Sequence, residues 1–187
     1  GGKREQTSKN TRVKARVKAE ALREFITVKD KIFVMGHKLT DVDAFGAAIG
    51  IYRAAAALEK NAHIVINEIS ASLRPLYECY EKDPSYPDDL FLTSAEAIPM
   101  VDEESMVIVV DTNRPRMTEC EDLLKKTKTI VVLDHHRQSS DNIDNALLSY
   151  IEPYASSACE MVSEVLQYIV DDIKIPKIEA SSFMPVS

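Results

Sequence analysis

Three short clusters in the chain combine histidine and aspartate. They are His37-x-x-x-Asp41-x-Asp43, Asp111-Thr112-Asn113 and Asp134-His135-His136, and each follows an apolar run. Carboxylates that lie close together repel one another unless a cation neutralises them, and mixed imidazole and carboxylate ligands suit first-row divalent ions. If the clusters meet in space, they could form a two-metal hydrolytic site with ions about 4 Å apart.

Each of these residues also has an ordinary structural interpretation. Asp41 or Asp43 could cap a helix, and Asp111 could be a turn residue after a strand. His63, the fourth histidine, begins an apolar segment, and we expect it to be structural. The agreement of ligand types across the three clusters favours metal binding for the others.

The elements that must position the clusters can be identified from apolar periodicity. Short apolar runs predict strands, and amphipathic or alanine-rich stretches predict helices. The expected strands are residues 31–35, 63–66, 106–110 and 129–133, and a further short strand is expected at 147–151. The expected helices are residues 11–26, 43–60, 72–80, 93–97, 118–126 and from Ser156 or Ser157 to about 171. Thr118 and Glu121 resemble a capping box that opens the helix over 118–126.

Strands that alternate with helices predict an α/β fold, with a mostly parallel sheet flanked by helices and preceded by a linker helix. The carboxyl ends of parallel strands share one edge, so the clusters should converge there. We divide the chain into a tag or disordered end (1–10), a basic linker helix (11–28), the metal-binding domain (29–173) and a truncated or foreign tail (174–187). The basic helix surface could contact phosphate, although a solvated helix explains it equally simply.

Composition restricts the partners and the compartment. The formal net charge of −7 argues against general nucleic-acid binding through phosphates. No apolar run approaches the roughly 20 residues that span a bilayer, so we expect a soluble, cytoplasmic chain. The three cysteines are odd in number and far apart, which favours reduced thiols.

The ordered clusters, within residues 31–171, resemble the DHH phosphoesterase superfamily. Its members include RecJ-type exonucleases, family II pyrophosphatases, oligoribonucleases and cyclic dinucleotide phosphodiesterases. Three segments are similar in sequence to the branch of membrane-anchored cyclic di-AMP phosphodiesterases. They are Met35-Gly36-His37-Lys38, Asp111-Thr112-Asn113-Arg114 and Asp134-His135-His136-Arg137. That resemblance implies a parent protein with membrane helices, a PAS-like domain and a GGDEF domain ahead of this cytoplasmic part.

The same resemblance implies roles for the metal ligands. His37 and Asp41 would hold one manganese ion, and Asp43 and His135 would hold the other. Asp111 would bridge the two ions.

The resemblance also implies catalytic and substrate-binding residues. His136 would contact the scissile phosphate, Asp134 would orient the histidines, and Arg137 would neutralise phosphate. The expected substrate-binding residues are Asn113, Arg137, Ser156 and Ser157, although helix capping is an equally open role for the two serines. Gln138 stands where many relatives carry a second arginine.

Two family features are missing from this sequence. No glycine follows Gly50, so the glycine-rich GGGH motif of the nucleotide-binding second subdomain is absent, and no evident aspartate follows the last matched helix to complete the metal ligands. We therefore expect the intact protein to hydrolyse cyclic di-AMP to linear pApA, and this fragment to be weakly active or inactive.

Three alternatives remain open at this point. The enzyme could be an oligoribonuclease or RecJ-like nuclease, or a pyrophosphatase. The chain could instead be a non-catalytic metal-binding or nucleotide-binding module. Surface exposed by truncation could also favour a homodimer.

Overall fold

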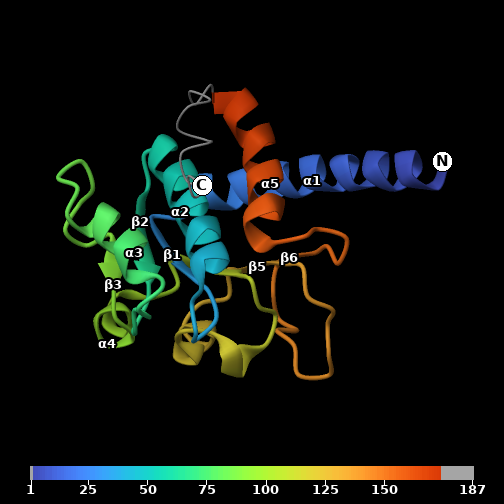
Figure 1. The fold of residues 1–187 in the computed structure, drawn as a ribbon. Helices are drawn as coiled ribbons and strands as arrows, with labels where there is room; N and C mark the ends of the chain where they lie inside the picture. Colours follow the sequence, from blue (N-terminus) through green and yellow to red (C-terminus); the bar gives the residue numbers. More distant parts are fainter. Residues whose placement is uncertain (1, 174–187) are drawn as a thin grey trace.

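One sheet of six parallel strands organises the chain (Figure 1). The computed structural model describes residues 2–173. The strand order is β3-β2-β1-β4-β5-β6. The strands are β1 (Lys31–Met35), β2 (Asn61–Val65), β3 (Phe91–Leu92), β4 (Ser105–Val110), β5 (Ile130–Asp134) and β6 (Leu148–Ile151). The predicted parallel α/β architecture is confirmed, and the two-residue β3 is the strand that periodicity missed because it is too short to show alternation.

Helices cover the two faces of the sheet unequally. The α-helices are α1 (Gly2–Val28), α2 (Val42–Ala57), α3 (Arg74–Glu81), α4 (Ser94–Ala97) and α5 (Ala158–Ile173). The long helices α1, α2 and α5 gather on one face (Figure 1). The other face packs on loops and on the 3-10 helices η1 (Ile98–Met100) and η3 (Glu121–Lys125). A third 3-10 helix, η2 (Pro115–Met117), has no residue in this core.

Alternation along β1 shows how the sheet separates its two apolar cores. Ile32 and Val34 pack in the core formed with α1, α2 and α5, whereas Phe33 and Met35 pack in the core on the opposite face. Successive strand residues point to opposite faces, so a strand that is apolar throughout is buried on both sides. Such strands put their polar residues at the ends, where the candidate site lies.

Helix α1 differs from the prediction in its start and in its buried face. It begins at Gly2, so it includes the residues that we expected to be a tag or a disordered end. Its buried side chains toward the core are Ala15, Ala19, Leu22 and Ile26. The four-residue spacing that predicted this helix puts Val13 and Val17 on its apolar face, but each is 57% exposed. Small alanines let the helix pack closely on its neighbours. The domain division itself stays a prediction, and the tail at 174–187 lies outside the described residues.

The prediction of a helix over residues 118–126 is wrong. The segment forms the short helix η3, and Cys120 rather than Thr118 precedes it. The hydroxyl group of buried Thr118 donates to the carbonyl oxygen of Pro115 at 2.7 Å, so it does not cap a helix. A true capping box is instead formed by Thr93 and Glu96 at the start of α4.

Helix α2 ends earlier than its composition suggested. The prediction placed its end at Lys60, but the helix stops at Ala57. Glu59 adopts a positive φ of 60°, the left-handed conformation that commonly ends helices.

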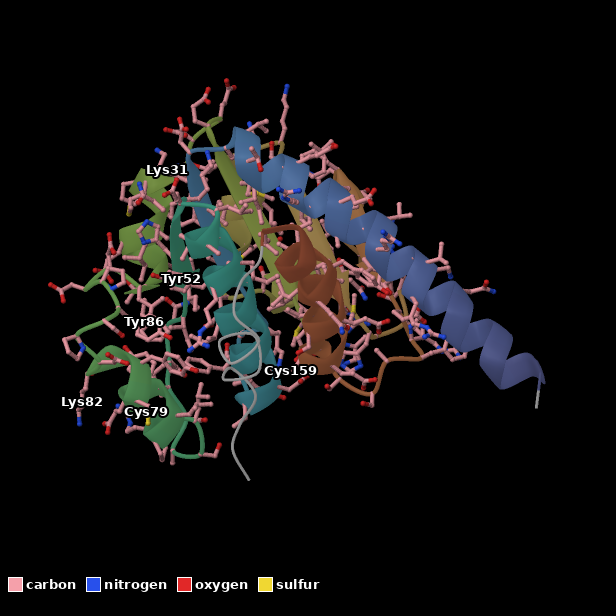
Figure 2. All side chains as sticks on the ribbon, turned by 90° about the horizontal axis from the view of Figure 1, so that it is seen from above. Lys31, Tyr52, Cys79, Lys82, Tyr86 and Cys159 are labelled. Carbon is pink, nitrogen blue, oxygen red and sulfur yellow. The ribbon has the colours of Figure 1, made fainter. Side chains whose placement is uncertain are left out.

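The three cysteines lie in different segments of the fold. Cys79, Cys120 and Cys159 form no disulfide within the described part of the chain, and Figure 2 shows Cys79 on α3 and Cys159 at the start of α5. Among residues 2–173, no helix combines the length and the apolar character needed to cross a membrane.

Candidate metal centre

The three histidine and aspartate clusters meet at one edge of the sheet. They follow β1, β4 and β5, which are neighbours at its centre. Together they surround a cavity of about 500 Å³, which all of the predicted site residues line except Ser156 and Ser157. The predicted convergence at the carboxyl ends of the strands is therefore what the structure shows.

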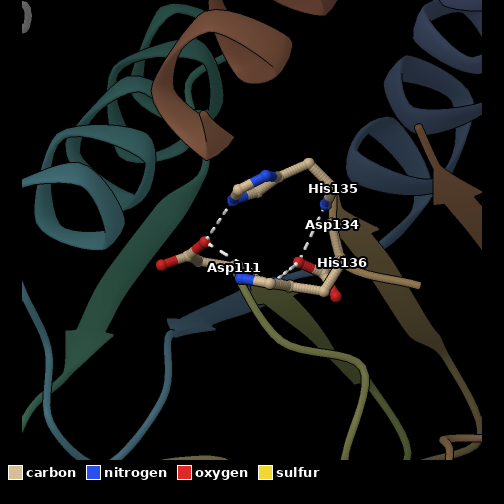
Figure 3. A group of neighbouring side chains, drawn as sticks. All are labelled: Asp111, Asp134, His135 and His136. Carbon is tan, nitrogen blue, oxygen red and sulfur yellow. Dashed lines mark hydrogen bonds and ion pairs between the residues drawn. The ribbon is translucent and has the colours of Figure 1, made fainter. Parts of the chain in front are cut away.

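Asp111 lies between two histidines that come from different strands. Its Oδ1 is 3.0 Å from Nε2 of His135, and its Oδ2 is 3.3 Å from Nε2 of His37. Figure 3 shows the His135 contact, and it shows that Nδ1 of His136 approaches the same oxygen, at 4.0 Å. A carboxylate that offers each oxygen to a different imidazole has the geometry of a group that can bridge two cations.

The backbone of Asp111 adopts a left-handed conformation with φ of 64°. Only a few per cent of non-glycine residues do so, and aspartate is among the residues that tolerate it best. The conformation turns the chain directly after β4 while the side chain remains buried. Such backbone strain concentrates at functional sites.

His37 carries the clearest electrostatic signature of the site. Its hydrogen bond to Asp111 raises its pKa above 6.5, the effect of burial opposes this, and Asp41 and Glu119 add to the increase. Nε2 of His37 is also 3.9 Å from a carboxylate oxygen of Asp41. The surrounding carboxylates therefore favour positive charge at His37, and a bound cation would meet the same field.

Asp134 is fully buried and directs the two histidines that follow it. One oxygen accepts the Nδ1–H of His136 at 2.7 Å and the backbone N–H of His135 at 2.8 Å. The other accepts the side-chain amide of Asn113 at 2.7 Å. Because Asp134 engages Nδ1 of His136, Nε2 is the ring atom left for a ligand.

Asn113 has a different contact from the one expected of it. Its amide nitrogen donates to Asp134 and, at 3.2 Å, to the carbonyl oxygen of His136. The structure therefore assigns it to holding Asp134 and His136 in place, and direct contact with substrate stays a prediction.

The family can now be stated, since the fold and the clusters are both described. The sequence matches the model of the DHH family, N-terminal domain, over residues 31–184. This chain belongs to the DHH family.

Two relatives are similar to this chain in sequence, and one solved structure is similar to it in fold. The chain is 38% identical over 186 residues to the cyclic-di-AMP phosphodiesterase PdeA of Listeria monocytogenes, and 40% identical over 188 residues to the cyclic-di-AMP phosphodiesterase GdpP of Bacillus subtilis. Each match covers 98% of this chain but only 28% of the relative. An exopolyphosphatase-related protein from Bacteroides fragilis shares the fold with a TM-score of 0.64 and 18% identity, over 89% of this chain and 50% of that one.

Asp43 of this DHH domain has a structural contact that the sequence did not reveal. Its two oxygens accept the backbone N–H groups of Ala158 and Cys159, each at 2.9 Å, at the start of α5. Among the described residues, the groups with ligand atoms within 4.8 Å of one another are His37, Asp41 and Asp111, and Asp111, Asp134, His135 and His136. Asp43 lines the cavity but is outside both groups.

Asp41 and one of the two predicted serines, Ser157, also form helix caps. Asp41 accepts the backbone N–H of Ala44 at 2.8 Å and caps α2, while its second oxygen faces His37. Ser157 accepts the N–H of Glu160 at 3.1 Å, and the hydroxyl group of Ser156 donates to the Glu160 carboxylate. The structure thus shows the capping role for Ser157, whereas Ser156 bonds only the Glu160 carboxylate among its described contacts.

Two arginines line the open side of the DHH cavity. Arg137 was predicted there, whereas Arg114 was not among the predicted site residues. Both are exposed, and Nε of Arg114 is 3.4 Å from Oγ of Ser139. Its position directly after Asp111-Thr112-Asn113 was the signal that could have identified it.

Proposed function

We propose that this DHH domain forms the metal-binding part of a phosphodiesterase that hydrolyses cyclic di-AMP to linear pApA. The observation that carries the proposal is Asp111, whose two oxygens face His37 and His135 within a cavity of about 500 Å³. The names of PdeA and GdpP supply the substrate. Because this chain spans 28% of each relative, the proposed activity is that of a longer protein.

The residues present fit two divalent metal ions, which we propose to be manganese. His37 and Asp41 would hold one ion, Asp43 and His135 the other, and Asp111 would bridge them. Two groups of ligand atoms that share Asp111, with mixed nitrogen and oxygen donors, support the fit for His37, Asp41, Asp111 and His135. Asp43 lies outside both groups, and its place in the set rests on its position in the lining of the same cavity. Such ions, when bound, lower the pKa of water and stabilise charge on phosphoryl oxygens.

The remaining groups would act on the substrate itself. His136, held through Nδ1 by Asp134, would direct Nε2 at the scissile phosphate and could transfer a proton there. Arg137 would neutralise phosphate charge at the open side of the cavity. Asn113 supports this arrangement through its contact with Asp134.

We further propose that this chain alone turns over cyclic di-AMP slowly or not at all. The sequence has no glycine after Gly50 and therefore no glycine-rich motif of the kind that grips nucleotide in the second subdomain. Membrane anchoring of the parent protein, a cytoplasmic position for this domain and a homodimer belong to the same proposal. Light scattering after gel filtration would test the dimer.

The decisive experiment uses the full catalytic region of the longer protein. Asp111→Asn keeps a residue that tolerates the left-handed backbone, so it removes a ligand with little strain. We expect Asp111→Asn and His135→Ala to abolish manganese-dependent hydrolysis of cyclic di-AMP, while exposed Asp144→Asn retains it. Full activity in either site variant would refute the proposal.

The choice of substrate separates the alternatives. Hydrolysis of pApA in preference to cyclic di-AMP would indicate a nuclease, and hydrolysis of pyrophosphate would indicate a pyrophosphatase. Nucleotide binding without release of a product, with manganese present, would indicate a non-catalytic module.

A further inference from the structure

Glu119 is a buried acid beside the metal centre that the proposed chemistry does not use. It does not line the cavity described above, and its carboxylate faces the body of the domain. Its backbone N–H donates to the carbonyl oxygen of Gly36 at 3.0 Å, and the preceding residue, Thr118, forms a β-bridge with His37. The segment that carries Glu119 is therefore paired with the start of the loop that holds the first two proposed ligands.

One oxygen of Glu119 contacts two other segments. Oε2 accepts the backbone N–H of Asn67 at 3.1 Å and is 3.5 Å from the hydroxyl group of Thr40. The amide of Asn67 in turn donates to the carbonyl oxygen of Glu119 at 3.0 Å. Glu119 is thereby fixed to the end of β2 by both its backbone and its side chain.

Thr40 connects this acid to the ligands. It is buried between His37 and Asp41 in the sequence, and its hydroxyl group donates to the carbonyl oxygen of His37 at 2.9 Å. Glu119 is the second acceptor near the same hydroxyl group. The hydroxyl hydrogen of Thr40 is donated to His37, and Oε2 of Glu119 packs beside the same oxygen at 3.5 Å, so Glu119 is in contact with the loop from His37 to Asp41.

We propose that Glu119 is a positioning residue for the His37 and Asp41 half of the metal centre, acting through Thr40 and Asn67. Burial of a carboxylate costs free energy unless hydrogen bonds compensate it. The chain retains Glu119 at a point that joins the end of β2 to the ligand loop. The inference depends on the proposed metal site, since it concerns the preorganisation of that site.

The contact geometry separates a positioning role from a purely electrostatic one. The contacts of the Glu119 carboxylate with Thr40 and with the backbone of Asn67 use the single atom Oε2, and the side chain of Asn67 also hydrogen-bonds the carboxylate. The carbonyl oxygen of a glutamine could accept both, so Glu119→Gln preserves the geometry and removes the charge. Glu119→Ala removes both.

The test measures manganese binding to this chain by isothermal titration calorimetry, together with thermal unfolding. We expect Glu119→Ala and Thr40→Val to weaken binding by about 10- to 100-fold, the usual cost of losing residues that orient metal ligands. Glu119→Gln should bind within about threefold of the unaltered chain, since orientation is retained. Thr127→Val is the matched control, because its buried hydroxyl group donates to the carbonyl oxygen of Ser105 at 2.7 Å, at the opposite edge of the sheet.

The outcomes are distinguishable. If the unaltered chain does not bind manganese, the proposed function fails and the inference fails with it. If the unaltered chain binds manganese and Thr40→Val and Glu119→Ala bind equally well, only the inference is overturned. A loss in Glu119→Gln as large as in Glu119→Ala would overturn positioning in favour of charge. An equal loss in Thr127→Val would show that reduced stability, not loop orientation, weakens binding.

Discussion

Asp43 accepts the backbone N–H of Cys159 at 2.9 Å, although the two residues are 116 positions apart. The second oxygen of Asp43 accepts the neighbouring N–H of Ala158, so the carboxylate caps α5 from the first turn of α2. A proposed metal ligand is thus also a link between two helices. If Asp43 binds metal as proposed, the stability of the fold and the binding of metal would share this side chain.

Removal of this link should be measurable without metal. We expect Asp43→Ala to lower the free energy of unfolding by about 1–2 kcal/mol, the range for loss of a helix cap. Urea denaturation in the presence of EDTA measures the effect, with exposed Asp144→Ala as the control. Equal stability of Asp43→Ala and the unaltered chain would show that the cap contributes nothing.

Asp134 should matter more for stability than its neighbours in the triplet. Its carboxylate accepts hydrogen bonds from His136, Asn113 and the backbone of His135. Asp134→Ala leaves these donors without an acceptor in a buried position, which should cost about 3 kcal/mol. Denaturant titration compares Asp134→Ala with His136→Ala, which should lose less free energy of unfolding because the ring of His136 is exposed. A larger loss in His136→Ala would contradict the stabilising role of the buried hydrogen bonds.

Glu119 should make stability depend on pH in a defined direction. Burial raises its pKa above the ordinary value of 4.5. The folded state then holds the proton more tightly than the unfolded state, so this contribution to stability is present below pH 4.5 and is lost as the pH rises through the raised pKa. We expect Glu119→Gln to gain stability relative to the unaltered chain between pH 4 and pH 8.

Urea titrations at several pH values test this difference. If the free energies of unfolding of Glu119→Gln and the unaltered chain differ by the same amount at every pH, the pKa of Glu119 is not raised by folding. Thr127→Val is the reference variant, and its free energy of unfolding should differ from that of the unaltered chain by an amount that does not vary with pH.

Two of the cysteines should differ sharply in reactivity. Burial raises the pKa of the Cys159 thiol to about 11, whereas Cys79 is exposed on α3. At pH 8 only about one Cys159 thiol in a thousand would be ionised, and the thiolate is the reactive form. Peptide mapping after brief iodoacetamide treatment should find Cys79 modified and Cys159 intact, and equal labelling would contradict the buried position.

The metal centre was predictable because its residue types and its strand ends are local features of the sequence. Asp111 and Asp134 each follow or end an apolar run, and parallel strands bring such ends together. The contacts between Asp43 and α5, or between Glu119 and Asn67, join segments that no periodicity connects. They could be found only from coordinates.

The errors in the predicted elements have similar physical causes. Thr118 and Glu121 have the spacing of a capping box, but the hydroxyl group of Thr118 is taken by Pro115. Val13 and Val17 lie at helical spacing, yet the buried face of α1 is the one that carries Ala15 and Ala19, because small side chains permit the closer approach. In each case tertiary packing overrode a valid local pattern.

The strands β1, β4 and β5 end within two residues of His37, Asp111 and His135, and this sets how the site tolerates change in the chain. Since neighbouring strand residues face opposite sides of the sheet, one residue inserted into β4 would rotate Asp111 away from both imidazoles. Substitutions remove one ligand at a time, but an insertion or deletion in any of these three strands would disassemble the whole centre. The lengths of the central strands are therefore as much a part of the candidate site as the side chains that follow them.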